Sequence, residues 1–524
     1  MPRPTGLSSA TERQGGPIAC YIRNTILPLR NDGVTRASIA FSVAVVNVLL
    51  ASWWSPASYH DNLRKSIHGE ITMAKSFIGR QAVVIGAGMS GLAAARALAD
   101  HFEKVTVLER GELPATPAQR TGTPQDRHLH GLLVGGLHAL GALLPGFGED
   151  VHRAGGVPMQ AGMDIRYEVP GCDAMPQRDF GMQAYGLSRP LLEFTLRRRI
   201  GQQANITLRQ HCRVLDILPA PDGIRASGVR YDTAAGNRET LAADFVVDAS
   251  SSGSLTLAFL RSIGQSVPEE TVIGVDIGYA TALYTIPEDA TPDWKGVITF
   301  PKAPENSRAA YLIPIEDDRW VLTVSGRHGD RPPAEEEAFL AFVQHLRMPT
   351  IYNAIKQAKR QGEIMRFGFV ESVWRHFERL DSFPRGLLPI GDAICRFNPV
   401  YGQGMSVGVQ EAHLLHEVLR IRAGDADPLA GLSQAFFAGA KTLIESPWAI
   451  SALPDFVFPE TRGQRPADLA DGLNFTAGLN RLAFRDPDVH RLLMEVQHLV
   501  KPYGSLRDPA LVERVQAELA AAAA

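Results

Sequence analysis

A glycine-rich turn between two apolar segments, within residues 82–110, constrains the fold of this chain more than any other stretch. The turn, Gly86-Ala87-Gly88-Met89-Ser90-Gly91, follows Val83-Val84-Ile85, a β-branched run typical of a buried strand. Small residues then continue at helical spacing to Ala99, and Val105–Leu108 has the composition of another strand. The stretch therefore predicts a strand, a helix and a second, parallel strand.

The spacing of the glycines indicates a nucleotide-binding turn. Gly86 permits the tight turn, Gly88 lets the backbone approach a pyrophosphate, and Gly91 lets helix and strand pack closely. The free N–H groups of the helix N-terminus favour the negative diphosphate. Glu109 ends the second strand, where a carboxylate accepts ribose hydroxyls and repels a 2′-phosphate, so we expect FAD or NAD rather than NADP here. The alternative is a tight turn without a ligand.

Composition excludes several classes of function. A chain of 524 residues with 45% hydrophobic residues can bury a large core and form more than one unit. Its net charge of −3 gives no electrostatic reason to bind nucleic acid. The four cysteines lack metal-ligand spacing, which suits a reducing cytosol, so we expect neither disulfides nor a metal site.

Residues 1–72 do not share the pattern of the rest. They hold several arginines ahead of Ala37–Trp54, an uncharged apolar stretch of 18 residues that is marginal for a membrane span. This arrangement resembles a signal anchor, which would bring membrane contact. The alternative, which we favour, is that these residues are not translated and that Met73 is the start; the protein is then cytoplasmic.

Two segments after the second strand offer cations for a diphosphate. The loop at 114–131 holds Arg120, whose guanidinium fork suits phosphate oxygens, together with His128 and His130. Each histidine is either solvated or in contact with the cofactor. Arg189 opens a later helix and is a second candidate cation.

A further buried strand at 244–249 ends in Asp248, and the small-residue turn Ser250–Ser254 follows. Such a turn can bring backbone N–H groups against a second part of the dinucleotide. It can equally be an ordinary turn between strand and helix.

The strand and helix patterns divide the chain. Strand-like runs separated by Pro, Asp and Gly begin near 272, so we expect a mostly antiparallel substrate domain at 271–380. Cofactor-binding segments at 73–270 and 381–425 flank it. The remainder, 426–524, is predicted to be helical and either covers the substrate domain or mediates dimerisation.

A second motif lies at 386–415. Strand Leu387–Ile390 ends in Gly391-Asp392, and the loop 398–404 leads into a helix beginning near Met405. The aspartate can bind ribityl hydroxyls, and the helix N-terminus can point at the N1–C2=O edge of a flavin. The motif therefore predicts a flavin.

With GAGMSG, Glu109, DASSSGS and GDAICRFNPVYGQGM in this order, the chain resembles the single-component, FAD-dependent aromatic hydroxylase and epoxidase superfamily over about 80–510. GTPQDRHLHGLL, VDIGYATALY and FNPVYGQGMSVG look most like bacterial polyene epoxidases of polyether biosynthesis. The resemblance implies an α/β fold, with a glutathione-reductase-type Rossmann FAD domain interleaved with a mostly antiparallel β substrate domain and a helical C-terminus.

The resemblance also implies roles for residues. Arg120 and Arg189 would lie at the diphosphate, Asp392 at the ribityl chain, and Pro399 and Gly402 in a flavin-facing catalytic loop without an acid or base. The cofactor-binding residues expected from motif and resemblance are Gly86, Gly88, Gly91, Glu109, Arg120, Arg189, Asp248, Gly391, Asp392, Gly404 and Met405. One departure matters: Ser251-Ser252 replace the usual Gly-Arg of the superfamily, which bears on the reductant.

The activity implied is that of a flavin monooxygenase. NADPH or NADH would reduce FAD, and a flavin C4a-hydroperoxide formed with O₂ would epoxidise or hydroxylate an apolar alkene or aromatic small molecule. The expected role is in secondary metabolism. No convincing base stands out, which favours epoxidation over phenol hydroxylation. The alternatives are a reductase or dehydrogenase of prenyl-type substrates and a non-catalytic flavin-binding scaffold; a homodimer is a further expectation.

Overall fold

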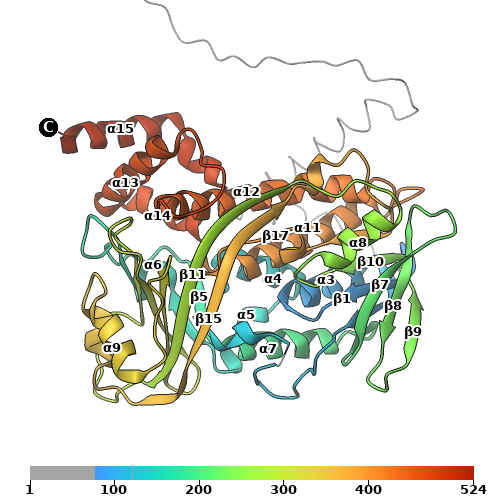
Figure 1. Cartoon of the computed structure of the whole chain (residues 1–524), viewed down its shortest axis with the longest axis horizontal. Helices are drawn as coiled ribbons and strands as arrows, with labels where there is room; N and C mark the ends of the chain where they lie inside the picture. Colours follow the sequence, from blue (N-terminus) through green and yellow to red (C-terminus); the bar gives the residue numbers. More distant parts are fainter. Residues whose placement is uncertain (1–76, 121, 524) are drawn as a thin grey trace, which may run out of the picture.

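The structure, a computed structural model, describes residues 77–120 and 122–523. Its first sheet is parallel, with the strand order β16-β10-β1-β2-β6. Figure 1 labels β1 and β10 of this sheet. The strands are β1 (Gly79–Ile85), β2 (Phe102–Leu108), β6 (Ile206–Arg209), β10 (Phe245–Asp248) and β16 (Leu387–Pro389). The glycine-rich turn follows β1 and Glu109 follows β2, so both lie at the carboxyl edge of this sheet.

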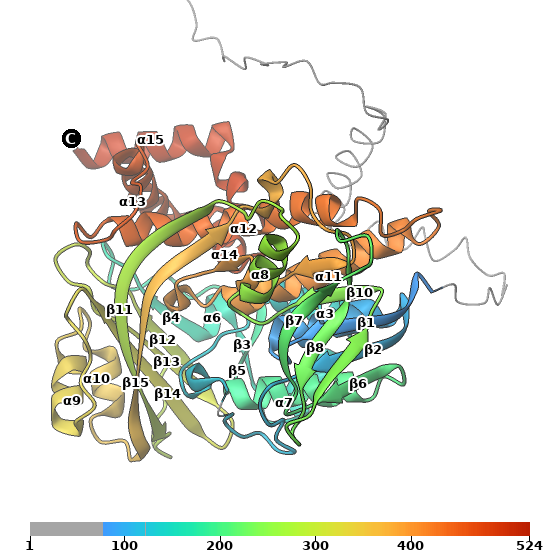
Figure 2. The same cartoon turned by 45° about the vertical axis from the view of Figure 1, so that its right-hand side comes forward.

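Helix α3 (Met89–Ala99) lies flat on β1 and β2 because its run Ala93–Ala95 is fully buried and leaves no bulk between helix and sheet. Helix α11 (Gly404–Arg422) packs on α3. A three-stranded antiparallel sheet, β7-β8-β9, packs against β10 (Figure 2). The other elements of this part are α4 (Val134–Leu143), α5 (Phe147–Arg153), α7 (Arg189–Gly201), β7 (Arg213–Pro219), β8 (Ala226–Asp232), β9 (Arg238–Ala242) and α8 (Ser254–Ser262).

The second large sheet has the strand order β17-β15-β11-β14-β13-β12-β4, and every pair except β12 with β4 is antiparallel. Its strands are β4 (Ile165–Glu168), β11 (Glu270–Thr285), β12 (Gly296–Thr299), β13 (Ala309–Ile315), β14 (Arg319–Arg327), β15 (Arg360–Arg375) and β17 (Cys395–Arg396). The two edge strands, β4 and β17, come from within 73–270 and 381–425, so both expected cofactor-binding segments contribute to this sheet.

One face of the second sheet is closed by α9 (Glu336–Gln344) and α10 (Thr350–Ile355), whose Phe339 and Ile351 belong to one buried apolar cluster with Leu312 of β13. Three short elements complete the middle of the chain: β3 (Val157–Gln160), α6 (Ala161–Asp164) and β5 (Gln183–Gly186).

The C-terminal region is helical and lies over the other face and one end of the second sheet (Figure 1). Its helices are α12 (Leu432–Phe456), α13 (Leu469–Arg485), α14 (Pro487–Gln497) and α15 (Pro509–Ala523). The Gly135 N–H donates to the carbonyl of His498 at 2.9 Å, and Gln410 Nε2 donates to the carbonyl of Leu499 at 3.0 Å. These bonds join the end of α14 to α4 and α11, while α13 and α14 share an apolar cluster with β13 and β14 of the second sheet. Whether these helices serve a substrate or a dimer stays a prediction.

The expected α/β fold, with a parallel sheet, a mostly antiparallel sheet and a helical C-terminus, is confirmed. The domain boundaries stay a prediction. Residues 1–76 fall outside the described part of the chain, so the expectations for 1–72 and for the apolar stretch Ala37–Trp54 stay untested. Within the described ranges, no helix combines the length and apolar character needed to span a bilayer.

Candidate functional site: a cavity shared by the two sheets

Both large sheets and the C-terminal helices line one cavity of about 1450 Å³. Small-molecule sites usually measure roughly 300–1,000 Å³, so this cavity has room for a dinucleotide and a second molecule. Of the residues expected from the sequence, those that line it are Gly86, Gly88, Gly91, Glu109, Arg120, Arg189, Asp392, Pro399, Gly402, Gly404 and Met405. The structure therefore brings together nearly the whole expected set, from segments far apart in the chain.

The glycine-rich turn has the shape expected of a pyrophosphate cradle. Gly86 has a φ of +99°, and a Cβ added to Gly91 would lie 2.0 Å from the Gly86 carbonyl oxygen. A Cβ at Gly88 would meet no atom within 4 Å, so its backbone faces open space. Glu109 is fixed across the turn, because its carboxylate accepts hydrogen bonds from Ala87 N and Gly111 N, each at 2.9 Å.

Two buried arginines meet at one carboxylate beside this turn. Arg189 donates to Glu193 Oε1 from Nε at 2.8 Å and from Nη2 at 2.5 Å, and Arg120 Nε lies 3.3 Å from Glu193 Oε2. Arg120 Nη1 also lies 3.7 Å from Glu109 Oε2. Glu193 was missed from the sequence, although its spacing of four residues from Arg189 on one helix is a signal for an ion pair.

Arg120 gives a test of whether these residues fit a diphosphate. Its Nε and Nη1 are buried and have no hydrogen-bond acceptor in the described part of the chain, because neither carboxylate contact has hydrogen-bond geometry. Asp126 holds the loop in place by accepting from Arg120 N at 2.7 Å. An incompletely bonded guanidinium, a second arginine and the open backbone at Gly88 are a donor set that matches pyrophosphate oxygens, so the site fits the group.

Asp248 and Gly391 are not among the residues that line the cavity. The Asp248 carboxylate accepts from Ser250 N at 3.0 Å and from Thr256 Oγ1 at 2.7 Å, so it fixes the serine turn and the first turn of α8. The Gly391 N–H donates to Glu411 Oε2 at 2.6 Å. Both residues position cavity-lining neighbours, and a strand-terminal acid gives no sequence signal of which way it faces.

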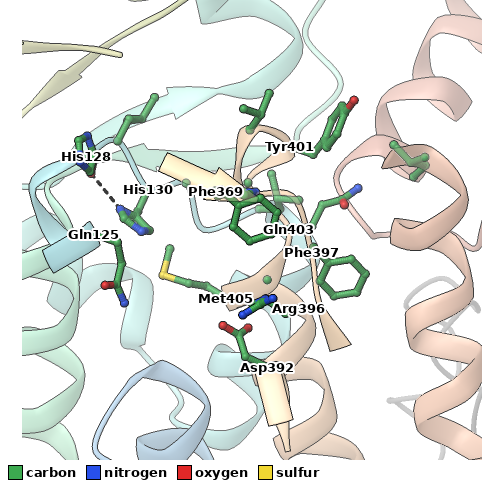
Figure 3. Close-up of a pocket in the computed structure, with 18 of the residues that line it drawn as sticks. Gln125, His128, His130, Phe369, Asp392, Arg396, Phe397, Tyr401, Gln403 and Met405 are labelled. Atoms are coloured by element: carbon green, nitrogen blue, oxygen red, sulfur yellow. Dashed lines mark hydrogen bonds between the residues drawn. The ribbon is translucent and has the colours of Figure 1, made fainter. Parts of the chain in front are cut away.

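Asp392 lines the cavity near the start of α11. Figure 3 shows it beside Arg396 and Met405. Burial raises the pKa of Asp392 to about 6, and the charges of Arg396 and Arg189 oppose that rise. A Cβ on Gly404 would lie 3.7 Å from Asp392 Oδ1, in ordinary van der Waals contact, so the first turn of α11 lies directly beside this carboxylate.

The loop 398–404 is held in place by residues outside the motif at 386–415. Asp455 of α12 accepts from Asn398 Nδ2 at 3.1 Å, from the Tyr401 hydroxyl at 2.9 Å and from Arg327 Nη1 at 2.6 Å. Arg327 and Asp455 are almost completely buried. Sequence reasoning missed both, because they are far apart in the chain and neither belongs to a local pattern. Gly402, with a φ of +67° and no atom within 4 Å of an added Cβ, faces open space in the cavity.

Of the two candidate histidines, His128 is buried and His130 is half-buried, and both are hydrogen-bonded within the fold. His128 Nδ1 lies 2.8 Å from Thr281 Oγ1, and its ring packs edge-on against Tyr279. His130 Nδ1 lies 2.9 Å from the His128 carbonyl oxygen (Figure 3). Burial, reinforced by Arg127, lowers the pKa of His128 to about 4, and burial with Arg189 lowers that of His130 to about 3. Both imidazoles line the cavity and are neutral near pH 7.

Comparisons with known proteins agree with this geometry. Residues 80–428 match the family described as FAD binding domain. The chain is 34% identical over 410 residues to "Protein Rv3254" of Mycobacterium tuberculosis, covering 74% of this chain and 83% of that protein.

Solved structures share the fold at low sequence identity. The flavin-dependent brominase Bmp2 has a TM-score of 0.59 at 16% identity, with 85% of this chain and 100% of that chain covered. PqsL of Pseudomonas aeruginosa, a probable FAD-dependent monooxygenase, has a TM-score of 0.53 at 16% identity, with 72% and 97% covered. The myxobacterial halogenase CndH has a TM-score of 0.53 at 19% identity, with 80% and 96% covered.

The predicted FAD-binding character of the chain is thus confirmed, and it shares its fold with FAD-dependent monooxygenases and halogenases, whereas a special closeness to polyene epoxidases stays a prediction. With its glycine turn, paired arginines and Asp392 around one cavity, this chain belongs to the FAD-binding domain family.

Proposed function

We propose that the protein is an FAD-dependent monooxygenase that takes electrons from NADPH or NADH and epoxidises or hydroxylates an apolar alkene or aromatic small molecule. One observation carries the proposal: the nucleotide-binding residues and an apolar wall line the same cavity. The wall comes from the second sheet, with Ile298 and Ile313, and from α14, with Leu493 and Met494.

In this proposal each end of FAD has its own residues. Glu109 accepts the ribose hydroxyls, Arg120 and Arg189 bind the diphosphate, and Asp392 binds the ribityl chain. The loop containing Pro399 and Gly402 and the first turn of α11 face the ring system. Bound FAD supplies hydride acceptance from the nicotinamide and activation of O₂ for transfer of one oxygen atom.

The protonation states favour a substrate that does not have to be ionised. A histidine whose pKa is about 4, as for His128, is a weak base at neutral pH. Burial raises the pKa of the Tyr279 phenol above its usual range, so it stays protonated. Among the described residues at this wall, none is poised to deprotonate a phenol, which supports an alkene or an electron-rich ring as the substrate class. The apolar wall excludes water from the reacting groups.

The turn Ser250–Ser254 bears on the electron donor. Ser251 and Ser252 line the cavity and are exposed, at positions where the superfamily usually has Gly-Arg. A donor that approaches here would meet hydroxyl groups instead of a guanidinium. We propose that reduction by free NADPH or NADH is slow, because this turn offers the donor no guanidinium.

The test uses the purified FAD-loaded protein, as the full chain and from Met73. Anaerobic mixing with NADPH or NADH measures flavin reduction, and mixing with isotopically labelled O₂ and a panel of apolar alkenes and phenols measures label in the product. Label incorporated with loss of the alkene supports the proposal.

The alternatives give different outcomes. Reduction of a prenyl-type alkene without O₂ would identify a reductase, and oxidised FAD that neither nicotinamide reduces, with or without substrates, would point to a scaffold. An Asp392→Ala variant tests the cofactor contact separately, because it should lower FAD content.

A further inference from the structure

A row of side chains crosses the sheet wall of the cavity. Tyr167 on β4 and Tyr311 on β13 both lie opposite Ile298 on β12. Tyr311 also lies opposite Thr323 on β14, which in turn lies opposite Thr281 on β11. Because directly opposed residues of neighbouring strands project to the same face, these side chains form one line. We call Tyr167, Tyr311, Thr323 and Thr281 the hydroxyl row.

The surroundings of the hydroxyl row are apolar. On β13 the neighbours of Tyr311 on the same face are Ala309 and Ile313, and both line the cavity. Across the cavity, Leu493 and Met494 of α14 pack in one cluster with Ile313 and Tyr167. This part of the cavity, which we call the chamber, can therefore bury an apolar molecule.

Most hydroxyls of the row already have partners. The Tyr167 hydroxyl lies 3.3 Å from His498 Nε2, Thr323 Oγ1 lies 2.7 Å from Thr281 Oγ1, and the latter lies 2.8 Å from His128 Nδ1. The Tyr311 hydroxyl makes no hydrogen bond within residues 77–120 and 122–523, although the residue lines the cavity. A hydroxyl group that lies in an apolar chamber without a hydrogen-bond partner binds best to a ligand that offers it an acceptor.

Tyr311 is also placed next to the loop assigned to the flavin ring. Burial raises the pKa of its phenol above the usual range, while the charge of Arg327 opposes and that of Asp455 adds to the rise. The phenol is therefore protonated at neutral pH and can donate. Tyr311 lies opposite Thr323 on β14, and the same strand ends in Arg327, which donates to the Tyr401 hydroxyl at 3.2 Å. Tyr311 therefore lies on the side of the chamber that faces the loop 398–404.

We propose, resting on the function proposed above, that Tyr311 is a specificity residue: its hydroxyl donates to a single hydrogen-bond-accepting oxygen on an otherwise apolar substrate. This oxygen, a ketone, ether or similar group, lies toward the loop 398–404, and the apolar remainder lies beneath α13 and α14. The substrate class is thus an apolar molecule that already carries one oxygen atom, and not a plain hydrocarbon.

The experiment measures binding without turnover. Oxidised FAD-loaded protein, with no nicotinamide present, is titrated calorimetrically with benzophenone and with its isostere in which a methylene group replaces the carbonyl oxygen. One neutral hydrogen bond predicts that the ketone binds about 3- to 10-fold more tightly. In Tyr311→Phe this preference should disappear, while the affinity for the isostere stays within about twofold.

Two variants control for the other tyrosines of the wall. Tyr167→Phe removes a hydroxyl that already has a partner and should keep the preference. Tyr279 also has no hydrogen-bond partner in the described ranges and lines the same cavity, so it is the competing donor. If Tyr311 holds the oxygen, Tyr279→Phe keeps the preference.

Several outcomes would overturn the inference: a preference unchanged in Tyr311→Phe, a preference lost in Tyr279→Phe instead, or no saturable binding of either probe. Because the assay needs neither reduction nor O₂, it separates this inference from the proposed activity. A protein that shows the ketone preference but never oxygenates a substrate would refute only the latter.

Discussion

Glu411 provides a test of the buried electrostatics behind the cavity. This side chain of α11 is fully buried, accepts from Gly391 N at 2.6 Å through Oε2, and has no hydrogen-bond partner for Oε1 within the described residues. Burial raises the pKa of Glu411 from 4.5 to about 8; the Gly391 bond opposes the rise, and the charge of Asp392 adds to it. The carboxyl is therefore protonated in the folded protein at pH 7.

The sign and size of the effect follow from linkage. Below pH 4.5 both the folded and unfolded states hold the Glu411 proton, so its titration has no effect. Between pH 4.5 and about 8 the unfolded chain releases the proton while the folded protein keeps it, so folding stability falls with rising pH. At about 1.4 kcal/mol per pH unit, the loss between pH 5.5 and 7.5 amounts to about 2–3 kcal/mol.

Glu411→Gln removes this titration with little change of shape. Urea unfolding of the FAD-saturated protein at pH 5.5 and 7.5 should show the stability of the variant, relative to wild type, rising by about 2–3 kcal/mol between the two pH values. Because Asp392 is present in both proteins, its own titration largely cancels in the comparison.

Glu417→Gln on the same helix is the matched control. Burial pushes the pKa of Glu417 upward, but its pair with Arg420 holds the value below 4.5, so its stabilising contribution is already complete at pH 5.5. Its difference from wild type should stay constant between the two pH values. If Glu411→Gln and wild type lose stability in parallel, Glu411 is ionised in the fold and the reasoning fails.

Three further changes test other parts of the fold. Gly91→Ala would place a Cβ 2.0 Å from the Gly86 carbonyl oxygen, so the turn must shift and purified protein should lose most of its FAD, measured as the ratio of flavin to protein absorbance; a full complement would contradict this. Ser251→Gly removes a positive φ of 68° from a non-glycine residue and should stabilise the protein by about 1 kcal/mol, seen as a rise in melting temperature rather than a fall. Asp455→Asn leaves Arg327 buried without its carboxylate and should destabilise the protein by about 3–5 kcal/mol in urea unfolding; a loss below about 1 kcal/mol would show that the pair is dispensable.

Local patterns made the fold predictable where it depends on neighbours in sequence. The β1–α3–β2 unit and the strand–loop–helix at 386–415 follow from glycine spacing and apolar runs, and both are present. The 16-residue strand β15 was not predicted. It pairs with β11 along most of its length, with two register irregularities, and no local turn signal marks that long-range pairing.

The residues of the candidate site were likewise predictable only where a local sequence motif marks them. Residues that a local motif assigns to the cofactor, such as Gly88 in the glycine-rich turn and Asp392 before the loop 398–404, line the cavity. Asp248 shows the limit, because a strand-terminal acid has the same sequence signature whether it faces a cofactor or caps its own turn. Asp455 was missed, since only the folded chain brings it to Arg327.

Glu193 explains how Arg120 and Arg189 can lie close together in a buried site. Arg120 and Arg189 would repel each other there, and removing two guanidiniums from water is costly unless an anion compensates. Glu193 contacts both, at 3.3 Å and 2.5 Å, so the pair is held together before any ligand arrives. One carboxylate cannot satisfy both forks, and Arg120 keeps unbonded nitrogens. The carboxylate therefore preorganises the two cations while leaving donor capacity for a second anion, which is the arrangement a diphosphate requires.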